Sequence, residues 1–193
     1  YAYLANGAPA RVGYHVTFSA PVVLEPRHGS WGFQPTSLVA GHPDRAPVTV
    51  TGQRPSAPTV GGDTRVATFN VLNYFSDLGV DEAGCMGYPD RTGAFVTAKK
   101  CKVRGAYSRE AFATQEAKIV SAINALGADV VALEEIENPL AVGVGTDRDA
   151  TLARLVAALN EAVGSNAWAY VPSPPVVPAD EDVIRVAFIY KTA

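Results

Sequence analysis

The spacing of apolar and polar positions divides this chain near residue 62. Before that point the apolar runs are short and are interrupted by many prolines and glycines, which is typical of short strands joined by turns. The segments with strand composition are 14–18, 21–24 and 48–51. We therefore predict a β-rich segment with a linker over residues 1–62 and a separate region over residues 63–193.

The region 63–193 begins with two apolar runs separated by an amphipathic segment. Residues 65–73 and 128–138 form the runs, and between them apolar residues recur at three- to four-residue steps, which predicts a helix. Ser108 is a suitable N-cap for this helix and Gly127 a suitable left-handed stop. Two strands joined by a helix are expected to lie parallel, because short hairpins join only antiparallel strands.

Parallel strands bring their carboxyl ends to one edge of a sheet, so this order of elements predicts a polar cluster. Asn70 ends the first apolar run, and Glu134 and Glu135 end the second. We expect these side chains to lie close together, at the edge where open α/β sheets usually bind ligands.

The rest of the chain predicts one more helix and two more strands, with Thr146 or Asp147 capping the helix. The predicted elements are a loop over 138–145, a helix that ends at Gly164, a strand over 167–171, an extended proline-rich connection over 172–178 and a strand over 182–190. The predicted fold class is therefore α/β in the broad sense, of the α+β kind.

The composition fits a folded domain and excludes several classes of function. Of the 193 residues, 48% are hydrophobic and 18% are charged, so a sizeable core is expected and wholesale disorder is not. The net charge of −3 argues against nucleic-acid binding through bulk charge, so a polyanion would have to be held locally or through a metal. No apolar run approaches the roughly 18 residues of a membrane span. Because the chain opens at Tyr1 without an initiator methionine or a signal peptide, we expect a piece of a longer protein.

Two cysteines, Cys85 and Cys101, lie in a glycine-rich polar loop. So few thiols, together with a single methionine, suit an oxidising and exported setting. A bridge between them would close a loop of about 17 residues and stabilise the fold by about 3 kcal/mol in the chain-entropy model. We predict this disulfide, and the alternative is two unpaired thiols in a cytosolic loop.

The acids at the end of the second run supply the candidate chemistry. Glu134, Glu135 and Glu137 lie within four residues, and strand alternation puts Glu135 and Glu137 on one side of the strand. A hard cation such as Mg²⁺ binds one or two carboxylates, an amide oxygen and waters, so an acid beside Asn70 would suit it. The alternative is that these acids lead into solvent where the strand ends.

Other chemistries lack the residues they need. The sequence has no Gly-x-Ser-x-Gly elbow, no Walker loop and no pair of Cys or His at zinc spacing. His15, His28 and His42 are scattered among the turns of the first segment, and we assign them no role. A metal-dependent nuclease or phosphatase would also need a histidine at its site, and none follows His42.

A basic stretch precedes the predicted helix. Its five basic residues surround Tyr107 and are Lys99, Lys100, Lys102, Arg104 and Arg109. Such a patch would follow a phosphate backbone through contacts that weaken as salt is added. The alternative is a solvated flank of the helix.

Several blocks, in this order, resemble the large extracellular bacterial nucleases of the endonuclease/exonuclease/phosphatase superfamily, which have the DNase I-like fold. The blocks are RVATFNVLNYF at 65–75, RGA at 104–106, QEAKIV at 115–120, ADVVALEEIEN at 128–138 and IRVAFIYK at 184–191. The resemblance covers about residues 64–193. Residues 11–58 resemble, more weakly, the β-rich segment that precedes the nuclease in those proteins, and the cysteine pair is a further similarity.

The resemblance implies a phosphodiesterase dependent on Mg²⁺ or Mn²⁺, with Ca²⁺ as an alternative, built as a sandwich of two sheets flanked by helices. Asn70 and Glu135 match the family positions at the metal site, whereas Glu134 stands where the family usually has a neutral residue. Leu72 stands where some members carry a further acid.

A later strand of the family approaches the substrate, and Asp182, Arg185 and Tyr190 lie on the matching segment. The family's catalytic histidine, its Asp-x-Asn block and its terminal Asp-His pair have no counterpart before Ala193. The resemblance therefore covers only the first half of a DNase I-like domain. We expect the missing half, or self-association through an open sheet, to complete it.

These expectations combine into one reading of the chain, with two alternatives. We predict part of a secreted, metal-dependent nuclease that hydrolyses DNA, or alternatively RNA, with nucleic acid as its partner and no activity in residues 1–193 alone. The first alternative is a phosphomonoesterase or lipid phosphodiesterase of the same superfamily. The second is a non-catalytic fragment that binds nucleic acid.

Overall fold

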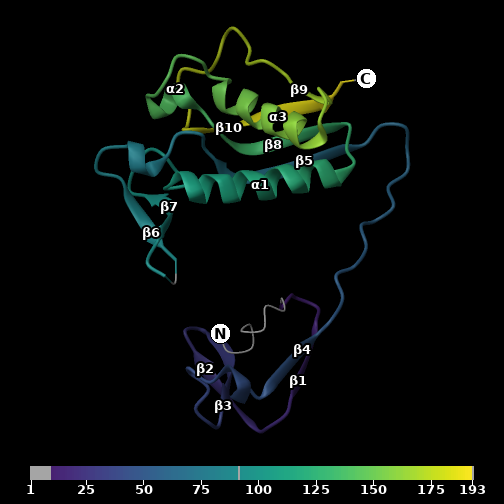
Figure 1. Cartoon of the computed structure of the whole chain (residues 1–193), viewed down its shortest axis with the longest axis vertical. Helices are drawn as coiled ribbons and strands as arrows, with labels where there is room; N and C mark the ends of the chain where they lie inside the picture. The colour runs from purple at the N-terminus through teal and green to yellow at the C-terminus, as the bar shows by residue number, and fades with distance from the viewer. Residues whose placement is uncertain (1–9, 91, 193) are drawn as a thin grey trace. The chain divides into compact units, whose positions relative to one another are not determined.

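The computed structural model describes residues 10–90 and 92–192. The chain forms two compact units, Tyr1–Thr59 and Val60–Ala193, and each has its own β-sheets (Figure 1).

The first unit consists of two antiparallel strand pairs. Its elements are β1 (His15–Phe18), which pairs with β4 (Val48–Thr51), β2 (Val22–Arg27), which pairs with β3 (Ser30–Pro35), and the 3-10 turn η2 (Pro43–Arg45). His28 and Gly29 join β2 to β3 and both have positive φ, as the twist of a two-residue hairpin requires. The three predicted strands are confirmed. We did not predict β3, because Gly32 and Pro35 lower its strand propensity.

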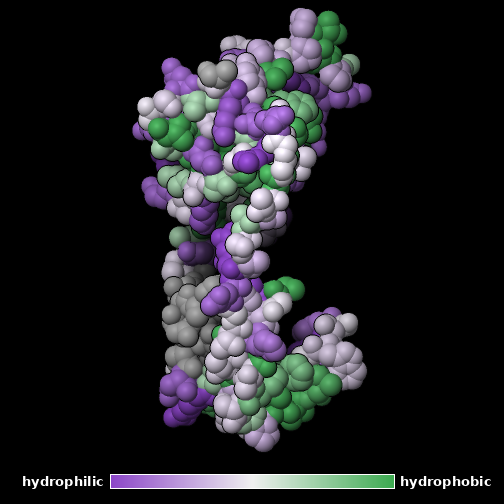
Figure 2. Space-filling model, turned by 90° about the vertical axis from the view of Figure 1, so that its right-hand side faces the viewer, coloured by the Kyte–Doolittle hydropathy of each residue, from purple (hydrophilic) through white to green (hydrophobic). Residues whose placement is uncertain are grey.

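Large apolar side chains of this unit stand at its surface. Leu24, Trp31 and Phe33 are more than half exposed, and the rings of Phe18 and Phe33 lie 5.0 Å apart. Figure 2 shows a patch of hydrophobic residues on the surface of this unit.

The second unit contains a four-stranded mixed sheet in the order β5–β8–β10–β9. Its strands are β5 (Val66–Tyr74), β8 (Val130–Glu137), β9 (Trp168–Tyr170) and β10 (Ile184–Lys191), and its helices are α1 (Arg109–Leu126), α2 (Pro139–Val142) and α3 (Ala150–Val163). β5 and β8 are parallel, as predicted, and β10 is antiparallel to β8 and β9. The arrangement is a mixed α/β fold, so the coarse fold class is confirmed.

The connection between β5 and α1, which we expected to be a loop, contains structure of its own. The turn η3 (Gly79–Asp81) is followed by an antiparallel hairpin of β6 (Met86–Pro89) and β7 (Phe95–Lys99). At the tip of the hairpin, the Asp90 carboxylate accepts the backbone N–H groups of Thr92 and Ala94 at 2.7 and 3.1 Å. We did not predict this hairpin, because local hydrogen bonding of this kind stabilises a turn without a pattern of apolar residues.

The helix ends follow the expected capping chemistry in one case and depart from it in the other. The Ser108 hydroxyl accepts the N–H of Ala111 at 3.2 Å, and Gly127 is left-handed, so both predicted ends of α1 are confirmed. The predicted cap of α3, Thr146 or Asp147, is wrong, because the helix starts after Asp149. The Asp147 carboxylate instead accepts the N–H of Asp149 at 2.8 Å and closes the turn that precedes the helix.

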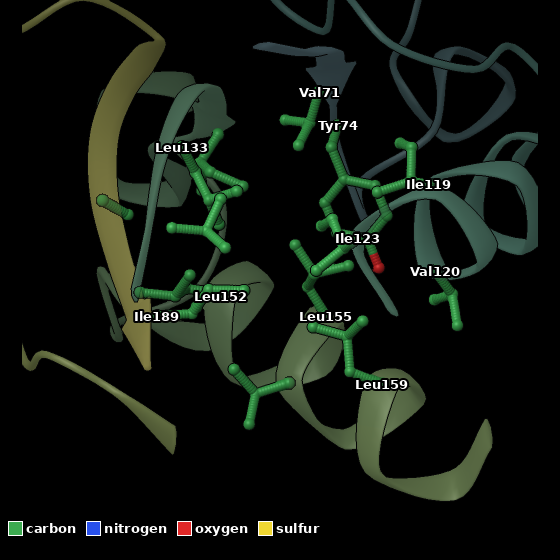
Figure 3. Packing of buried hydrophobic residues seen from close by; sticks show 14 of the residues in the cluster. Val71, Tyr74, Ile119, Val120, Ile123, Leu133, Leu152, Leu155, Leu159 and Ile189 are labelled. Atoms are coloured by element: carbon green, nitrogen blue, oxygen red, sulfur yellow. The ribbon is translucent and has the colours of Figure 1, made fainter. Parts of the chain in front are cut away.

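The core of this unit lies between the sheet and the helices α1 and α3. Figure 3 shows side chains from β5, β8, β10 and both helices meeting there. Members that are completely buried include Val71, Ile123, Leu133, Leu155 and Ile189. Each contributes about 1.5–3 kcal/mol of burial free energy, so the core holds the end of β5 rigidly against β8.

The other side of β10 is also apolar but remains exposed. Side chains alternate along a strand, so Val186, Phe188 and Tyr190 face away from the buried Ala187 and Ile189. Their exposed fractions are 67%, 48% and 39%. A strand that is apolar on both sides is typical of a sheet covered on both faces.

Candidate metal and nucleic-acid site

The carboxyl ends of β5 and β8 meet at one edge of the sheet, as the sequence predicted. Asn70 lies directly opposite Glu134 in the parallel register, and pairing resumes only at Tyr74, opposite Ile136. The stretch of β5 from Val71 to Asn73 therefore faces Glu135 alone. This break in the pairing of the two strands lies where the predicted site residues are.

The backbone at this edge is strained. Leu72, Asn73 and Glu135 have φ values of 55°, 52° and 64°, in the left-handed region that non-glycine residues avoid. For Leu72 and Glu135 such a conformation costs roughly 1–2 kcal/mol each, whereas asparagine adopts it more readily, and it persists only where the surroundings impose it. Strain concentrated at a sheet edge is a feature of functional sites.

Hydrogen bonds from three side chains impose this conformation. The Asn70 side-chain oxygen accepts the N–H of Leu72 at 2.8 Å, and the Glu135 carboxylate accepts the N–H of Asn73 at 2.9 Å. Gln115, on α1, donates to the carbonyl oxygens of Leu72 and Asn73 at 2.8 and 3.3 Å. The predicted residues Asn70 and Glu135 thus hold the two ends of the same turn.

The donor atoms at this edge suit a hard cation. Asn70 is exposed and Glu135 is half-buried, and both present oxygen. Within residues 10–90 and 92–192 no group of three or more His, Cys, Asp or Glu side chains could hold a metal ion. An ion held by Glu135 and Asn70 would therefore keep most of its ligands as water, as Mg²⁺ commonly does.

Glu137, which the sequence did not single out as a site residue, lies beneath this edge of the sheet. Its side chain is completely buried, so the alternative that the acids of β8 lead into solvent does not hold for this residue. One carboxylate oxygen accepts the N–H of Ser76 at 2.8 Å and the hydroxyl of Thr151 at 2.6 Å. Burial raises the pKa of Glu137 to about 7, the Thr151 hydrogen bond opposes this shift, and the charge of Asp77 adds to it. The one available signal was an acid within a strand that the apolar pattern predicts to be buried.

A second polar network lies at the start of α3. Arg185 pairs with Asp149 at 2.8 Å, and the Asp149 carboxylate accepts both the N–H and the hydroxyl of Ser173 at 2.7 and 2.6 Å. Burial alone would raise the pKa of Asp149, but the Ser173 hydrogen bonds and the Arg185 charge hold that pKa below its usual value. The predicted residue Arg185 is therefore engaged in an internal ion pair.

The neighbouring loops are tied by a further ion pair. Arg148 pairs with Glu181, and Glu181 accepts the Asn138 side-chain N–H at 3.1 Å. Of the other two residues predicted on this strand, Asp182 pairs with Arg104 at 2.7 Å, and Tyr190 lies on the exposed side of β10. The structure does not bring Asp182, Arg185 or Tyr190 into hydrogen-bonding contact with Asn70 or Glu135 among its described residues.

A groove of about 850 Å³ lies beside β5 and is bounded by α1 and β7. Its lining includes the predicted residues Asn70 and Arg104, the helix residues Gln115 and Lys118, and the aromatic ring of Phe95. A lining that is mainly apolar and includes an aromatic ring and basic side chains suits a nucleotide strand, because bases stack on aromatic rings while phosphates meet cations.

The predicted basic residues are partly neutralised. Arg104 pairs with Asp182, Arg109 pairs with Asp81 at 3.6 Å, and Lys99 lies over the Tyr88 ring, 4.3 Å from its centroid. Lys100 and Lys102 are exposed. These two lysines are therefore the strongest candidates of the group for contacting phosphate.

The predicted disulfide between Cys85 and Cys101 is confirmed, with the two Cα atoms 5.0 Å apart. It ties the turn before β6 to the segment after β7. The Glu82 carboxylate reinforces this link, because it accepts the N–H groups of Lys102 and Val103, both at 2.9 Å. The basic segment is thus anchored on a cross-linked hairpin.

Comparison with protein-family models, with curated proteins and with solved structures finds no match to this chain. None of the helices in the described residues is long and apolar enough to cross a membrane.

Proposed function

We propose that this chain is part of a secreted, metal-dependent nuclease of the DNase I-like superfamily that hydrolyses phosphodiester bonds in DNA. The observation that carries the proposal is the strained turn at the end of β5, where Asn70 and Glu135 lie at the edge of two parallel strands and each fixes a backbone N–H. The disulfide supports an oxidising destination.

Glu135 and Asn70 are the residues that would hold Mg²⁺ or Mn²⁺. Such a cation supplies charge stabilisation to a phosphate as its oxygens gain negative charge. The chain's own residues fix the donors, since the hydrogen bond from the Asn73 N–H orients the Glu135 carboxylate and the bond to the Leu72 N–H orients the Asn70 amide. Ligands held in advance bind a cation without a further ordering cost.

The substrate strand would lie in the groove beside β5. Within the groove, Phe95 offers a face on which a base can stack and Lys118 offers charge to a phosphate. The exposed Lys100 and Lys102, which follow β7 and do not line the groove, would offer further charge to the strand. Water attack also requires a general base, and the sequence has no histidine after His42. We therefore expect residues 1–193 to bind metal and DNA without cleaving DNA.

The test is Mn²⁺ binding to residues 1–193, measured by titration calorimetry and by the electron-spin signal of free Mn²⁺. We expect Glu135→Gln to abolish the site, because the neutral amide attracts the cation far less than a carboxylate does. Glu134→Gln is the matched control, since this neighbouring acid carries no assigned role and should leave Mn²⁺ affinity unchanged. Equal binding by wild type and Glu135→Gln would refute the proposed site.

A further inference from the structure

Asn70 and Glu135 fix the start of a turn at Leu72 and Asn73, and Glu137 fixes its end at Ser76 and Asp77. Its Oε2 atom accepts the N–H of Ser76 at 2.8 Å, the Ser76 hydroxyl at 3.2 Å and the N–H of Asp77 at 3.3 Å. Ser76 and Asp77 lie shortly after Asn73 in the sequence, separated from it by the buried Tyr74 and Phe75. The end of the turn is thus fixed to β8 from inside the protein.

The same carboxylate connects the turn to α3. Thr151, in the first turn of the helix, donates its hydroxyl to Glu137 Oε2 at 2.6 Å, and its oxygen lies 2.7 Å from the Ser76 hydroxyl. Thr151 is completely buried. The positive end of the helix dipole also favours a carboxylate at this place. Glu137 therefore sits where the turn, the sheet and the helix meet.

The two acids of β8 act on the turn in parallel. Glu135 accepts the N–H of Asn73, and Glu137, two residues later on the same strand, accepts the N–H of Ser76. A shift of the Ser76 end would be passed to Asn73 through Tyr74, whose ring is buried and whose hydroxyl donates to Glu116 at 2.5 Å. The direction of the Glu135 carboxylate thus depends on the anchor at Glu137.

This arrangement is expensive if its only purpose is stability. A buried carboxylate loses several kcal/mol of hydration, which hydrogen bonds recover in part, and an apolar residue of similar volume is often as stabilising or more so. Among the described residues, no ion pair involves Glu137, and its Oε1 atom is buried without a hydrogen-bond partner. A specific geometric requirement explains why an acid occupies this position.

We propose that Glu137 is a positioning residue for the metal site, which fixes the 73–77 turn so that Asn73 N–H holds the Glu135 carboxylate in its ligand orientation. The inference rests on the proposed function for its purpose, but the link from Glu137 to Asn73 can be measured without any metal. Glu137 itself does not touch the ion or the substrate.

The test uses two readouts on residues 1–193. The first is the proton chemical shift of the Asn73 amide in metal-free ¹H–¹⁵N spectra, which reports its hydrogen bond to Glu135. The second is Mn²⁺ affinity. Glu137→Gln keeps the shape of the side chain but replaces the charged carboxylate with a neutral amide, whose oxygen is a weaker acceptor for the bonds that Oε2 now receives, so we expect the Asn73 amide to move upfield. We expect Mn²⁺ affinity to fall by about 10-fold or more, as for other residues that orient a ligand.

Thr151 supplies a matched pair in case Glu137→Gln does not fold. Thr151→Val removes the hydroxyl at nearly constant volume, whereas Thr151→Ser keeps it, so only the valine variant should move the Asn73 amide and weaken Mn²⁺ binding. Wild-type values for both readouts in folded Glu137→Gln, or in folded Thr151→Val, would overturn the positioning role.

The two proposals can fail separately. If Glu135→Gln binds Mn²⁺ as well as wild type does, the proposed metal site is wrong, and the Asn73 amide shift still decides whether Glu137 controls the turn. If Glu135→Gln loses Mn²⁺ but Glu137→Gln keeps both wild-type values, the metal site stands and only the positioning role is refuted.

Discussion

The carboxylate of Glu135 accepts the backbone N–H of Asn73 at 2.9 Å, although the residue directly opposite Asn70, where the regular pairing of β5 with β8 breaks, is Glu134. The acid that binds the turn is thus one residue beyond the regular register. The register shift and the left-handed backbone of Glu135 and Asn73 make this possible. The carboxylate that we propose as a metal ligand is thus held in place by a break in the regular strand pairing.

The left-handed residues of the turn give the first prediction. Leu72 is 75% exposed and has a φ of 55°, so Leu72→Gly should relieve about 1 kcal/mol of backbone strain and leave stability unchanged or slightly raised. Val66→Gly is the matched control, because Val66 is 71% exposed on the same strand without positive φ, and should lose about 1 kcal/mol. Urea unfolding of both variants measures the difference, and equal losses would contradict the strain.

The two sides of β10 give the second prediction. Ile189→Thr should destabilise the second unit by about 2–4 kcal/mol, because Ile189 is completely buried. Phe188→Thr, one residue earlier, should change stability by less than about 1 kcal/mol, since its side chain is half exposed and threonine retains strand propensity. Unfolding can be followed by Trp168 fluorescence after Trp31→Phe removes the other tryptophan.

The exposed face of β10 should also bind hydrophobic dyes. We expect Phe188→Thr to lower the fluorescence of bound anilinonaphthalene sulfonate and to reduce self-association in sedimentation runs. Unchanged dye binding would show that the face is not accessible in solution.

The sequence predicted the elements that depend on periodicity and missed the ones that depend on individual hydrogen bonds. The stripe of α1 and the parallel order of β5 and β8 followed from apolar spacing, and the meeting of Asn70 with the acids of β8 followed from that order. The hairpin β6–β7 did not follow, because its turn rests on the Asp90 carboxylate.

The candidate site was predictable in its location but not in its internal support. Strand alternation placed Glu137 on the same side as Glu135, but alternation does not tell whether an acid at a strand end points into solvent or under a helix. That depends on Thr151 and Ser76, which are 14 and 61 residues away from Glu137 in the chain. The partner of Arg185 could not be predicted for the same reason, since Asp149 lies 36 residues away in the chain.

The ion pair of Asp149 and Arg185 gives the third prediction, a dependence of stability on pH. Because the folded-state pKa of Asp149 is depressed, its contribution is fully present above the unfolded-state pKa, near 3.9, and is lost as pH falls through the folded-state value. Asp149→Asn should therefore remove part of the acid sensitivity of the second unit below pH 4. Urea unfolding of wild type and Asp149→Asn between pH 2.5 and 6 tests this, and parallel stability profiles would contradict it.

The disulfide gives the fourth prediction. Cys85 and Cys101 are 16 residues apart, so replacing both with alanine should lower the free energy of unfolding by about 3 kcal/mol in the chain-entropy model. Reduction of the wild type should have a similar effect and leave the double variant unchanged, which is the control for non-specific action of the reductant. A reduced wild type as stable as the oxidised form would refute the contribution.

The pairing of the basic residues gives the last prediction. Lys100 and Lys102 are exposed, whereas Arg104 and Arg109 are each paired with an acid. If DNA follows the hairpin, Lys100→Ala with Lys102→Ala should weaken binding of single-stranded DNA and lower the slope of log affinity against log salt by about 1–2. Arg109→Ala should have a smaller effect, because its charge is already compensated by Asp81. Fluorescence anisotropy over a salt series separates these outcomes, and identical slopes in all three proteins would exclude a phosphate track along this segment.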